Sequence, residues 1–274
     1  MNHFLKSLLG LVLFTSTALA QFSSVNSSTE NIPAYYGAGF ASEYKANHLN
    51  NKDLLEALFK IISNGHKPVG YTSAKKIMFG KLDLQQLPTG EYAVKDSYCE
   101  RIFTDADFEI QSIGPMMAPN SGNVINTEHT WPQSKFTAKF PKETQKSDLH
   151  HLYPTDSEMN NRRSSYDFGD VLIPKFALKC PIGKLGQQAD GETVFEAPTN
   201  HRGNVARAIF YFATRYQLKI SSQQELALRR WNIEDPIDQA ERDRNTAVQL
   251  EQGNRNPFID MPTLVDHISS FNIK

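Results

Sequence analysis

Apolar residues recur at helical spacing in two segments of the chain. Between residues 53 and 63 they are Leu54, Leu55, Leu58, Ile61 and Ile62. Between residues 203 and 216 they are Val205, Ala208, Ile209, Phe212, Ala213 and Tyr216. This spacing predicts two amphipathic helices, each with one continuous apolar face. Asn64-Gly65 supplies a stop for the first.

Capping signals predict three more helices toward the C-terminus. Ser222 followed three residues later by Glu225 forms a capping box at the start of a third helix. Asp235, as N-cap, and Gly253, as stop, enclose a fourth helix. Residues 262–270 predict a short last helix.

Short apolar runs separated by Gly and Pro predict strands. The clearest candidate is residues 98–103, and residues 171–180 and 192–195 are two more, with a turn at Asp190-Gly191. Helices and strands do not alternate strictly. We therefore expect an α+β fold, in which the helices are segregated from a small sheet.

The first 20 residues are typical of a secretory signal. Lys6 precedes an apolar run from Leu8 to Phe14, and Ala18-Leu19-Ala20 places small residues before a cleavage site after Ala20. The run is too short for an ordinary membrane span. We expect a secreted or periplasmic protein, and a retained N-terminal anchor is the alternative.

The remaining composition is that of a globular domain. Of the 274 residues, 39% are hydrophobic and 22% are charged, which excludes a collagen-like or wholly disordered chain. Residues 21–33 begin with a run rich in Ser, Asn and Thr and are expected to form a flexible leader. Residues 21–274 are expected to form a single domain. Because no later stretch approaches membrane length, no membrane partner is expected.

Net charge gives no support for a nucleic-acid partner. The chain has 29 basic and 30 acidic residues, and removal of the signal takes away Lys6 alone, leaving 28 against 30. Two segments are locally basic, residues 135–163 by +2 and residues 201–230 by +5. They could flank a polyanion site, or they could be solvated helix faces.

Cys99 and Cys180 are the two cysteines of the chain. Export permits a disulfide, and no other partner exists for either residue. We predict a bridge that encloses residues 100–179. The alternative is two unpaired buried thiols.

Residues 121–163 contain the unusual chemistry. Glu128 and His129 are neighbours, and neighbours on a strand point to opposite faces, so they can serve one site only where the strand ends. Trp131-Pro132 supplies such an end. Asn160 is expected on a helix or helical turn within residues 156–163, and its carbonyl oxygen suits a hard ion such as Mg²⁺. Alternatively, Glu128 and Asn160 are surface residues and His129 is a half-buried strand residue.

His150 and His151 are also neighbours. On a strand one of them would face inward, so at least one is expected to be structural. A zinc site built from His129, His150 and His151 is conceivable. Their spacing, however, matches no tight zinc-ligand pattern.

Three blocks occur in the order expected of a known family. They are Asn126-Thr127-Glu128-His129-Thr130-Trp131-Pro132-Gln133-Ser134, Asp148-Leu149-His150-His151-Leu152-Tyr153-Pro154 and Glu158-Met159-Asn160. Together they resemble the bacterial endonuclease I family of secreted or periplasmic nonspecific nucleases, which belongs to the His-Me finger (ββα-metal) superfamily. Residues 61–66, 202–208 and 252–260 also resemble family segments. The resemblance covers roughly residues 34–262.

This resemblance implies a ββα finger. Its first strand would end at Glu128-His129, its second would lie near residues 149–153, and its helix would lie near residues 156–163. His129 would be the general base. Glu128 and Asn160 would hold one divalent ion, normally Mg²⁺, with Ca²⁺ or Mn²⁺ as substitutes.

The resemblance also implies the substrate contacts and the reaction. Arg163 and His150 are expected to contact the substrate. The reaction would be phosphodiester hydrolysis in DNA that leaves 5′-phosphate products, and RNA stays open as a second substrate.

Two positions depart from the family pattern. Lys146 stands where some relatives carry an acid, and Asn161-Arg162-Arg163 stands where many have Gly-Asp-Arg. The charge along the phosphate path is therefore expected to differ. Two other functions stay open, an inactive extracellular DNA-binding protein and a zinc hydrolase of another ester.

Overall fold

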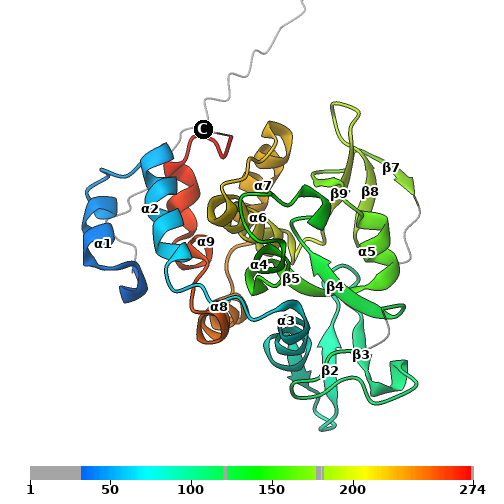
Figure 1. Cartoon of the computed structure of the whole chain (residues 1–274). Helices are drawn as coiled ribbons and strands as arrows, with labels where there is room; N and C mark the ends of the chain where they lie inside the picture. Colours follow the sequence, from blue (N-terminus) through cyan, green and yellow to red (C-terminus); the bar gives the residue numbers. More distant parts are fainter. Residues whose placement is uncertain (1–31, 120–121, 177–179, 181, 273–274) are drawn as a thin grey trace, which may run out of the picture.

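The computed structural model describes residues 32–119, 122–176, 180 and 182–272, and Figure 1 shows their arrangement. The expected signal and most of the expected leader lie outside the described residues. The α-helices are α1 (Ala38–Lys45), α2 (Asn51–Ser63), α3 (Tyr71–Ile77), α4 (Lys142–Lys146), α5 (Ser157–Arg163), α6 (Arg202–Tyr216), α7 (Ser222–Glu234), α8 (Gln239–Gln252) and α9 (Pro257–Asp260). Among these residues no helix is long and apolar enough to cross a membrane.

The described strands form three small sheets. β1 (Leu84–Gln86), β2 (Tyr92–Lys95) and β3 (Ile102–Thr104) form an antiparallel meander. β4 (Ile125–His129) pairs antiparallel with β5 (Leu152–Asp156). The third sheet has the order β6-β9-β8-β7 and comprises β6 (Asp167–Phe168), β7 (Ile173–Phe176), β8 (Lys184–Gln187) and β9 (Thr193–Glu196).

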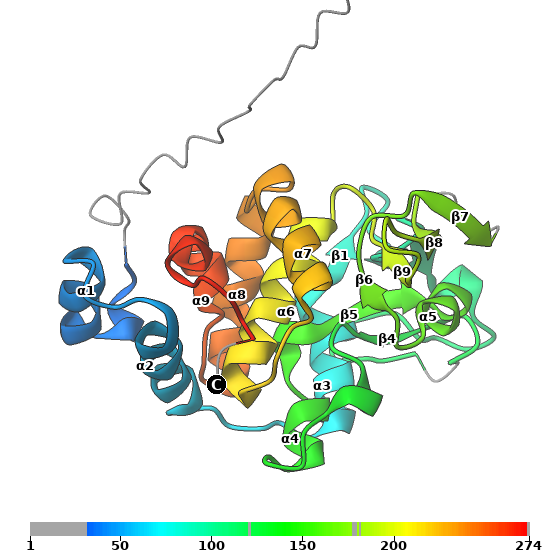
Figure 2. The ribbon, with the colours of Figure 1, turned by 90° about the horizontal axis from the view of Figure 1, so that it is seen from above.

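The predicted α+β class is confirmed. In both views α1, α2 and α9 gather at one end of the molecule, and the strands gather at the other (Figures 1 and 2). Helix α6 lies between α8 and α9 on one side and β4 and β5 on the other. The helices are thus segregated from small sheets.

Helix α6 is buried on all sides. Its apolar face was expected to be buried, but 13 of its 15 residues are buried. The face with Arg207, Tyr211 and Arg215 is covered as well, because each polar group meets a partner from another element. Arg207 pairs with Glu241 of α8 at 2.6 Å, and the Tyr211 hydroxyl donates to Asp148 at 2.9 Å.

Helix α7 begins at Ser222 as predicted, but its predicted capping box is wrong, and α8 begins three residues later than predicted. Helix α7 is capped by Ser221, whose hydroxyl accepts from the Gln224 amide, and Glu225 binds Arg229 instead of closing a capping box. Helix α8 is capped by Asp238. Asp235 ends α7, since the following proline disfavours helical backbone there. Gly253 ends α8 with φ +86°, as predicted.

The last predicted helix has a different form. Residues 262–267 form a 3-10 helix that ends before the expected residue 270, and the separate helix α9 precedes it. Both elements begin at a proline, Pro257 and Pro262. Proline fits the first turn of a helix but cannot continue an earlier one, so the segment is divided.

The strand expected at residues 98–103 is confirmed only at its end, because β3 covers Ile102–Thr104. Asp96 accepts hydrogen bonds from the backbone amides of Tyr98 and Cys99, which holds this segment in a turn, and the strand begins only at Ile102. Strand β9 and the turn before it were predicted, but β8 was not. Gly186 in β8 lies so close to β7 that a Cβ at this position would be 2.3 Å from the Ile173 carbonyl oxygen. Because glycine adds no side chain to the hydrophobic pattern, the sequence gives little indication of a strand there.

Candidate active site

Strands β4 and β5 and helix α5 form the predicted ββα finger. In the antiparallel pair, Glu128 lies opposite Tyr153 and His129 opposite Leu152. The Asp156 carboxylate caps α5 by accepting from the amides of Glu158 and Met159. This cap turns the chain directly from β5 into the helix that carries Asn160.

The second strand begins later than expected. Residues 149–151 form a 3-10 turn, capped by Asp148, and β5 starts at Leu152. His150 and His151 are therefore not strand neighbours, and both are buried. Their Nε2 atoms lie 3.1 Å from the Asn254 carbonyl and 2.9 Å from the Gln145 carbonyl. Both rings are part of the protein interior.

A surface cavity of ≈ 360 Å³ lies at the end of β4. Glu128, His129 and Asn160 all contribute to its lining, together with Gln133 and Arg163. The strand ends at His129, as the Trp131-Pro132 pair predicted, so two neighbouring side chains can face one space. The structure thus brings together three of the side chains singled out from the sequence.

Glu128 is almost fully buried, at 2% exposure. Its Oε1 atom accepts from the Tyr98 hydroxyl at 2.7 Å and meets Arg163 Nη1 at 3.1 Å. Burial raises the pKa of this carboxyl group, and the Arg163 charge opposes that rise. Neither of these two contacts involves Oε2.

The orientation of the Asn160 amide is set by its neighbours. Nδ2 donates to Asn126 Oδ1 at 2.5 Å and to the Thr127 carbonyl at 3.2 Å. Because a backbone carbonyl only accepts hydrogen bonds, the nitrogen must occupy this side of the amide. Asn160 Oδ1 is therefore directed away from both acceptors.

His129 has a defined tautomer. Its Nε2 lies 3.1 Å from the Lys146 carbonyl, which can only accept, so the neutral ring carries its proton on Nε2. Nδ1 is then an acceptor, 3.3 Å from the Gln133 amide nitrogen. Burial lowers the pKa of His129 to about 4, so the ring is neutral at pH 7. The ring can therefore accept a proton at Nδ1.

Arg163 reaches the same cavity but is only 1% exposed. Its guanidinium donates to the carbonyls of His129 and Thr130 at 3.2 and 2.6 Å, besides pairing with Glu128. Arg163 therefore connects the end of β4 to α5 through these hydrogen bonds. His150 does not line the cavity, because its ring packs on Tyr211 with 4.5 Å between centroids.

The family model described as Endonuclease I matches residues 50–263, which include every one of these groups. The chain belongs to the endonuclease I family.

Curated relatives of this family match part of the chain. An extracellular ribonuclease of Bacillus subtilis is 36% identical over 172 residues, covering 54% of this chain and 56% of the relative. A periplasmic deoxyribonuclease of Aeromonas hydrophila is 32% identical over 126 residues, covering 45% and 51%. An extracellular deoxyribonuclease of the same organism is 32% identical over 115 residues, covering 41% and 48%. The chain thus spans about half the length of these relatives.

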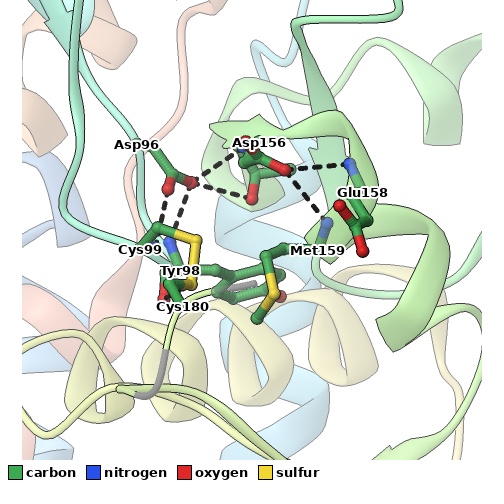
Figure 3. The surroundings of a disulfide bond; sticks show 8 residues. Asp96, Tyr98, Cys99, Asp156, Glu158, Met159 and Cys180 are labelled. Carbon is green, nitrogen blue, oxygen red and sulfur yellow. Dashed lines mark hydrogen bonds between the residues drawn. A yellow bond between two sulfur atoms is a disulfide. The ribbon is translucent and has the colours of Figure 1, made fainter. Parts of the chain in front are cut away.

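Tyr98 is a site residue of this endonuclease I chain that sequence reasoning missed. Its hydroxyl donates to Glu128. Its own backbone amide is held by Asp96, as Figure 3 shows. Asp96 also accepts from the Thr155 hydroxyl and the Asp156 amide, so it ties this turn to the start of α5. The contact spans 30 residues, and the sequence near Tyr98 carries no signal of it.

The predicted disulfide is present next to this turn. Cys99 and Cys180 are bridged, with 5.4 Å between their Cα atoms (Figure 3). The bridge encloses Glu128, His129 and Asn160, as expected. It fixes the residue that directly follows Tyr98.

The two basic segments differ in how their basic side chains are paired. In residues 201–230 four of the five arginines pair with carboxylates of the fold, as in Arg207–Glu241 and Arg229–Glu225, and Arg215 bonds His66 instead. In residues 135–163 Lys135 pairs with Asp167. Within the described part of the chain, Lys146 has no carboxylate within ion-pair distance.

Proposed function

We propose that this chain is an exported, metal-dependent, nonspecific endonuclease that hydrolyses phosphodiester bonds in DNA. One observation carries the proposal. A histidine with its proton on Nε2, a buried carboxylate and an amide oxygen all border one cavity at the end of β4. Residues 1–20 would direct export to the periplasm or the medium, and residues 21–274 would act as a single domain.

The side chains at this cavity fit one hard divalent ion. Glu128 supplies a carboxylate whose Oε1, and not Oε2, meets Tyr98 and Arg163, and Asn160 supplies an amide oxygen turned away from Asn126 and Thr127. Mg²⁺ prefers oxygen ligands and keeps several waters, so two protein ligands suffice. Ca²⁺ or Mn²⁺ would substitute. When bound, the ion would neutralise charge on the phosphate and on the leaving 3′ oxygen.

His129 would act as the general base. Its Nδ1 takes a proton from the attacking water, while the Lys146 carbonyl accepts from Nε2 and keeps the ring in place. With a pKa of about 4 the ring is neutral at pH 7 and able to take this proton; an anionic phosphate nearby would raise this pKa, and the bound ion would lower it. The resulting hydroxide would bond to phosphorus as the bond to the 3′ oxygen breaks; the 3′ oxygen would take a proton from solvent, and the other product would carry a 5′-phosphate.

Arg163 would position this machinery. Its two terminal nitrogens bond two strand carbonyls and Glu128, so we assign it to holding the end of β4. A phosphate contact, expected from the sequence, would use the part of the guanidinium that borders the cavity. His150, in contrast, would support the fold from the interior.

RNA is included among the proposed substrates. The relatives carry the names ribonuclease and deoxyribonuclease. Hydrolysis by a water activated at His129 does not need the 2′-hydroxyl and is open to both nucleic acids. Little sequence preference is expected, because phosphate contacts carry no base information.

The zinc hydrolase alternative finds no support in the donor set. Among the described residues no group of three or more His, Cys, Asp or Glu side chains is arranged to hold a metal. A catalytic zinc site uses three protein ligands. The Nε2 atoms of His129, His150 and His151 all face backbone carbonyls instead.

Digestion of plasmid DNA and of RNA tests the proposal. The purified protein is assayed with Mg²⁺, Mn²⁺, Ca²⁺ or Zn²⁺ and with EDTA, and the product ends are identified by phosphatase and ligase treatment. We expect cleavage with Mg²⁺, none with EDTA, and 5′-phosphate ends. DNA binding without cleavage under every metal would favour the inactive binding protein, and activity with Zn²⁺ alone would favour the zinc enzyme.

A further inference from the structure

Helix α3 begins beside the proposed base. The backbone amide of Tyr71, its first residue, donates to Glu143 Oε1 of α4 at 2.6 Å, which ties the two helices together. The Tyr71 ring lies 5.5 Å from the His129 ring between centroids, at an interplanar angle of 35°. An aromatic ring thus covers the side of His129 that faces α3.

Two lysines lie over this ring. The ammonium nitrogen of Lys146 is 4.1 Å from the Tyr71 centroid, and that of Lys75 is 5.5 Å from it. Both distances are within the range of cation–π attraction, which holds a long side chain in place. In the described part of the chain neither ammonium group meets a carboxylate, whereas Lys135 is neutralised by Asp167.

The position of this cluster relative to the cavity is informative. In both views β4 lies between α5 on one side and the pair α3 and α4 on the other (Figures 1 and 2). The cavity is bordered by Asn160 of α5, and the lysines belong to α3 and α4. A strand whose reacting phosphate lies at His129 would therefore have its next phosphates near Tyr71.

We propose that Tyr71, Lys75 and Lys146 form a phosphate subsite for the nucleic-acid backbone beside the scissile bond. This inference rests on the proposed function and deepens it. Lysine binds phosphate as a point charge without reading bases, which suits a nonspecific enzyme. Lys146 then has two tasks, because its carbonyl orients His129 while its side chain binds the substrate.

The test separates these two tasks. Lys75→Gln and Lys146→Gln keep every backbone group, so His129 stays oriented. Binding of a fluorescein-labelled DNA duplex is followed by anisotropy in EDTA, between about 50 and 200 mM salt. Each variant should bind about 5–10-fold more weakly and should lower the salt slope by about 0.9, the value for one lost phosphate contact. In Mg²⁺, KM should rise while kcat is unchanged, and Lys146→Arg should restore binding.

Lys76→Gln is the matched control. Lys76 is on the same helix and is exposed, and it is not part of the cluster. An equal loss of affinity in Lys76→Gln would show that diffuse charge alone matters and would overturn the subsite. Unchanged affinity in the two cluster variants, or a fall in kcat without a change in affinity, would overturn it too. A wild-type protein that neither binds nor cleaves nucleic acid would reject the proposed function itself.

Discussion

His129 Nδ1 is the atom on which the proposed chemistry depends. A general base is worth about 10²–10⁴ in rate, so His129→Ala should cleave plasmid DNA at least about 100-fold more slowly. Its DNA and Mg²⁺ affinities should stay near those of the wild type, because the ring contributes to neither. Cleavage rates and anisotropy measure the two effects, with thermal unfolding to confirm the fold. If raised Mg²⁺ restored the activity, His129 would be a ligand and the base assignment would be wrong.

Glu128 and Asn160 should fail in a different way. Glu128→Gln keeps the volume and loses the charge of the proposed ion ligand, and Asn160→Ala loses the amide oxygen. Both should shift the Mg²⁺ dependence of cleavage to higher concentration, and raised Mg²⁺ should partly rescue them. Asn161→Ala is the control, since this exposed neighbour does not border the cavity. A metal titration identical to that of the wild type would remove either residue from the ion site.

At the scale of elements, Arg163 joins α5 to the end of β4. Both members of its pair with Glu128 are buried, at 2% side-chain exposure each. Breaking such a pair leaves an uncompensated buried charge and costs about 3–5 kcal/mol. Arg163→Met should therefore lower the free energy of unfolding by this amount in urea titrations.

The neighbouring arginine provides the comparison for this prediction. Arg162 is half exposed and lies 3.9 Å from Glu158, so Arg162→Met should change the stability by less than about 1 kcal/mol. Similar effects of the two substitutions would mean that the buried pair of Arg163 and Glu128 is not the source of the stability.

The disulfide acts on the turn that carries Tyr98. Removing a native disulfide costs about 2–5 kcal/mol, so the Cys99→Ser, Cys180→Ser double variant should unfold at lower temperature. Because Cys99 follows Tyr98 directly, the hydrogen bond from Tyr98 to Glu128 should loosen as well. We therefore expect the Mg²⁺ dependence of cleavage to shift to higher concentration even well below the unfolding temperature. Unaltered metal dependence in the folded variant would confine the bridge to a stabilising role.

At the scale of the whole molecule, buried neutral histidines make the fold sensitive to acid. Burial lowers the pKa of His150 to about 4, below the ordinary value of 6.5. The unfolded chain therefore binds more protons between pH 6.5 and 4, and the stability that is present above this window is lost as the pH falls through it. For one such group the slope is about 1.4 kcal/mol per pH unit.

His150→Gln tests this sign. Gln can still donate to the Asn254 carbonyl, so part of the local bonding is retained. The variant should lose less stability than the wild type between pH 6.5 and 4, as measured by urea unfolding at several pH values. Exposed His48→Gln is the control for the loss of a histidine. A steeper acid dependence in His150→Gln would contradict the assignment.

The local pattern was enough for the elements that depend on local physics. Helices α2 and α6 follow from apolar spacing, and the end of α8 follows from Gly253, because these signals lie within the elements themselves. Ordered motifs likewise indicated Glu128, His129 and Asn160. The end of the strand before Trp131-Pro132 explained how two neighbouring residues on a strand can share one site.

Tertiary structure decided the remaining features, since their partners are far away in the sequence. The proton position on His129 depends on a carbonyl 17 residues later, and the Glu128 contact of Tyr98 spans 30 residues. Arg207 looks solvated in the sequence but is buried, because Glu241 neutralises it from another helix. Burial of a charge depends on which partner the fold supplies, and no local pattern contains that information.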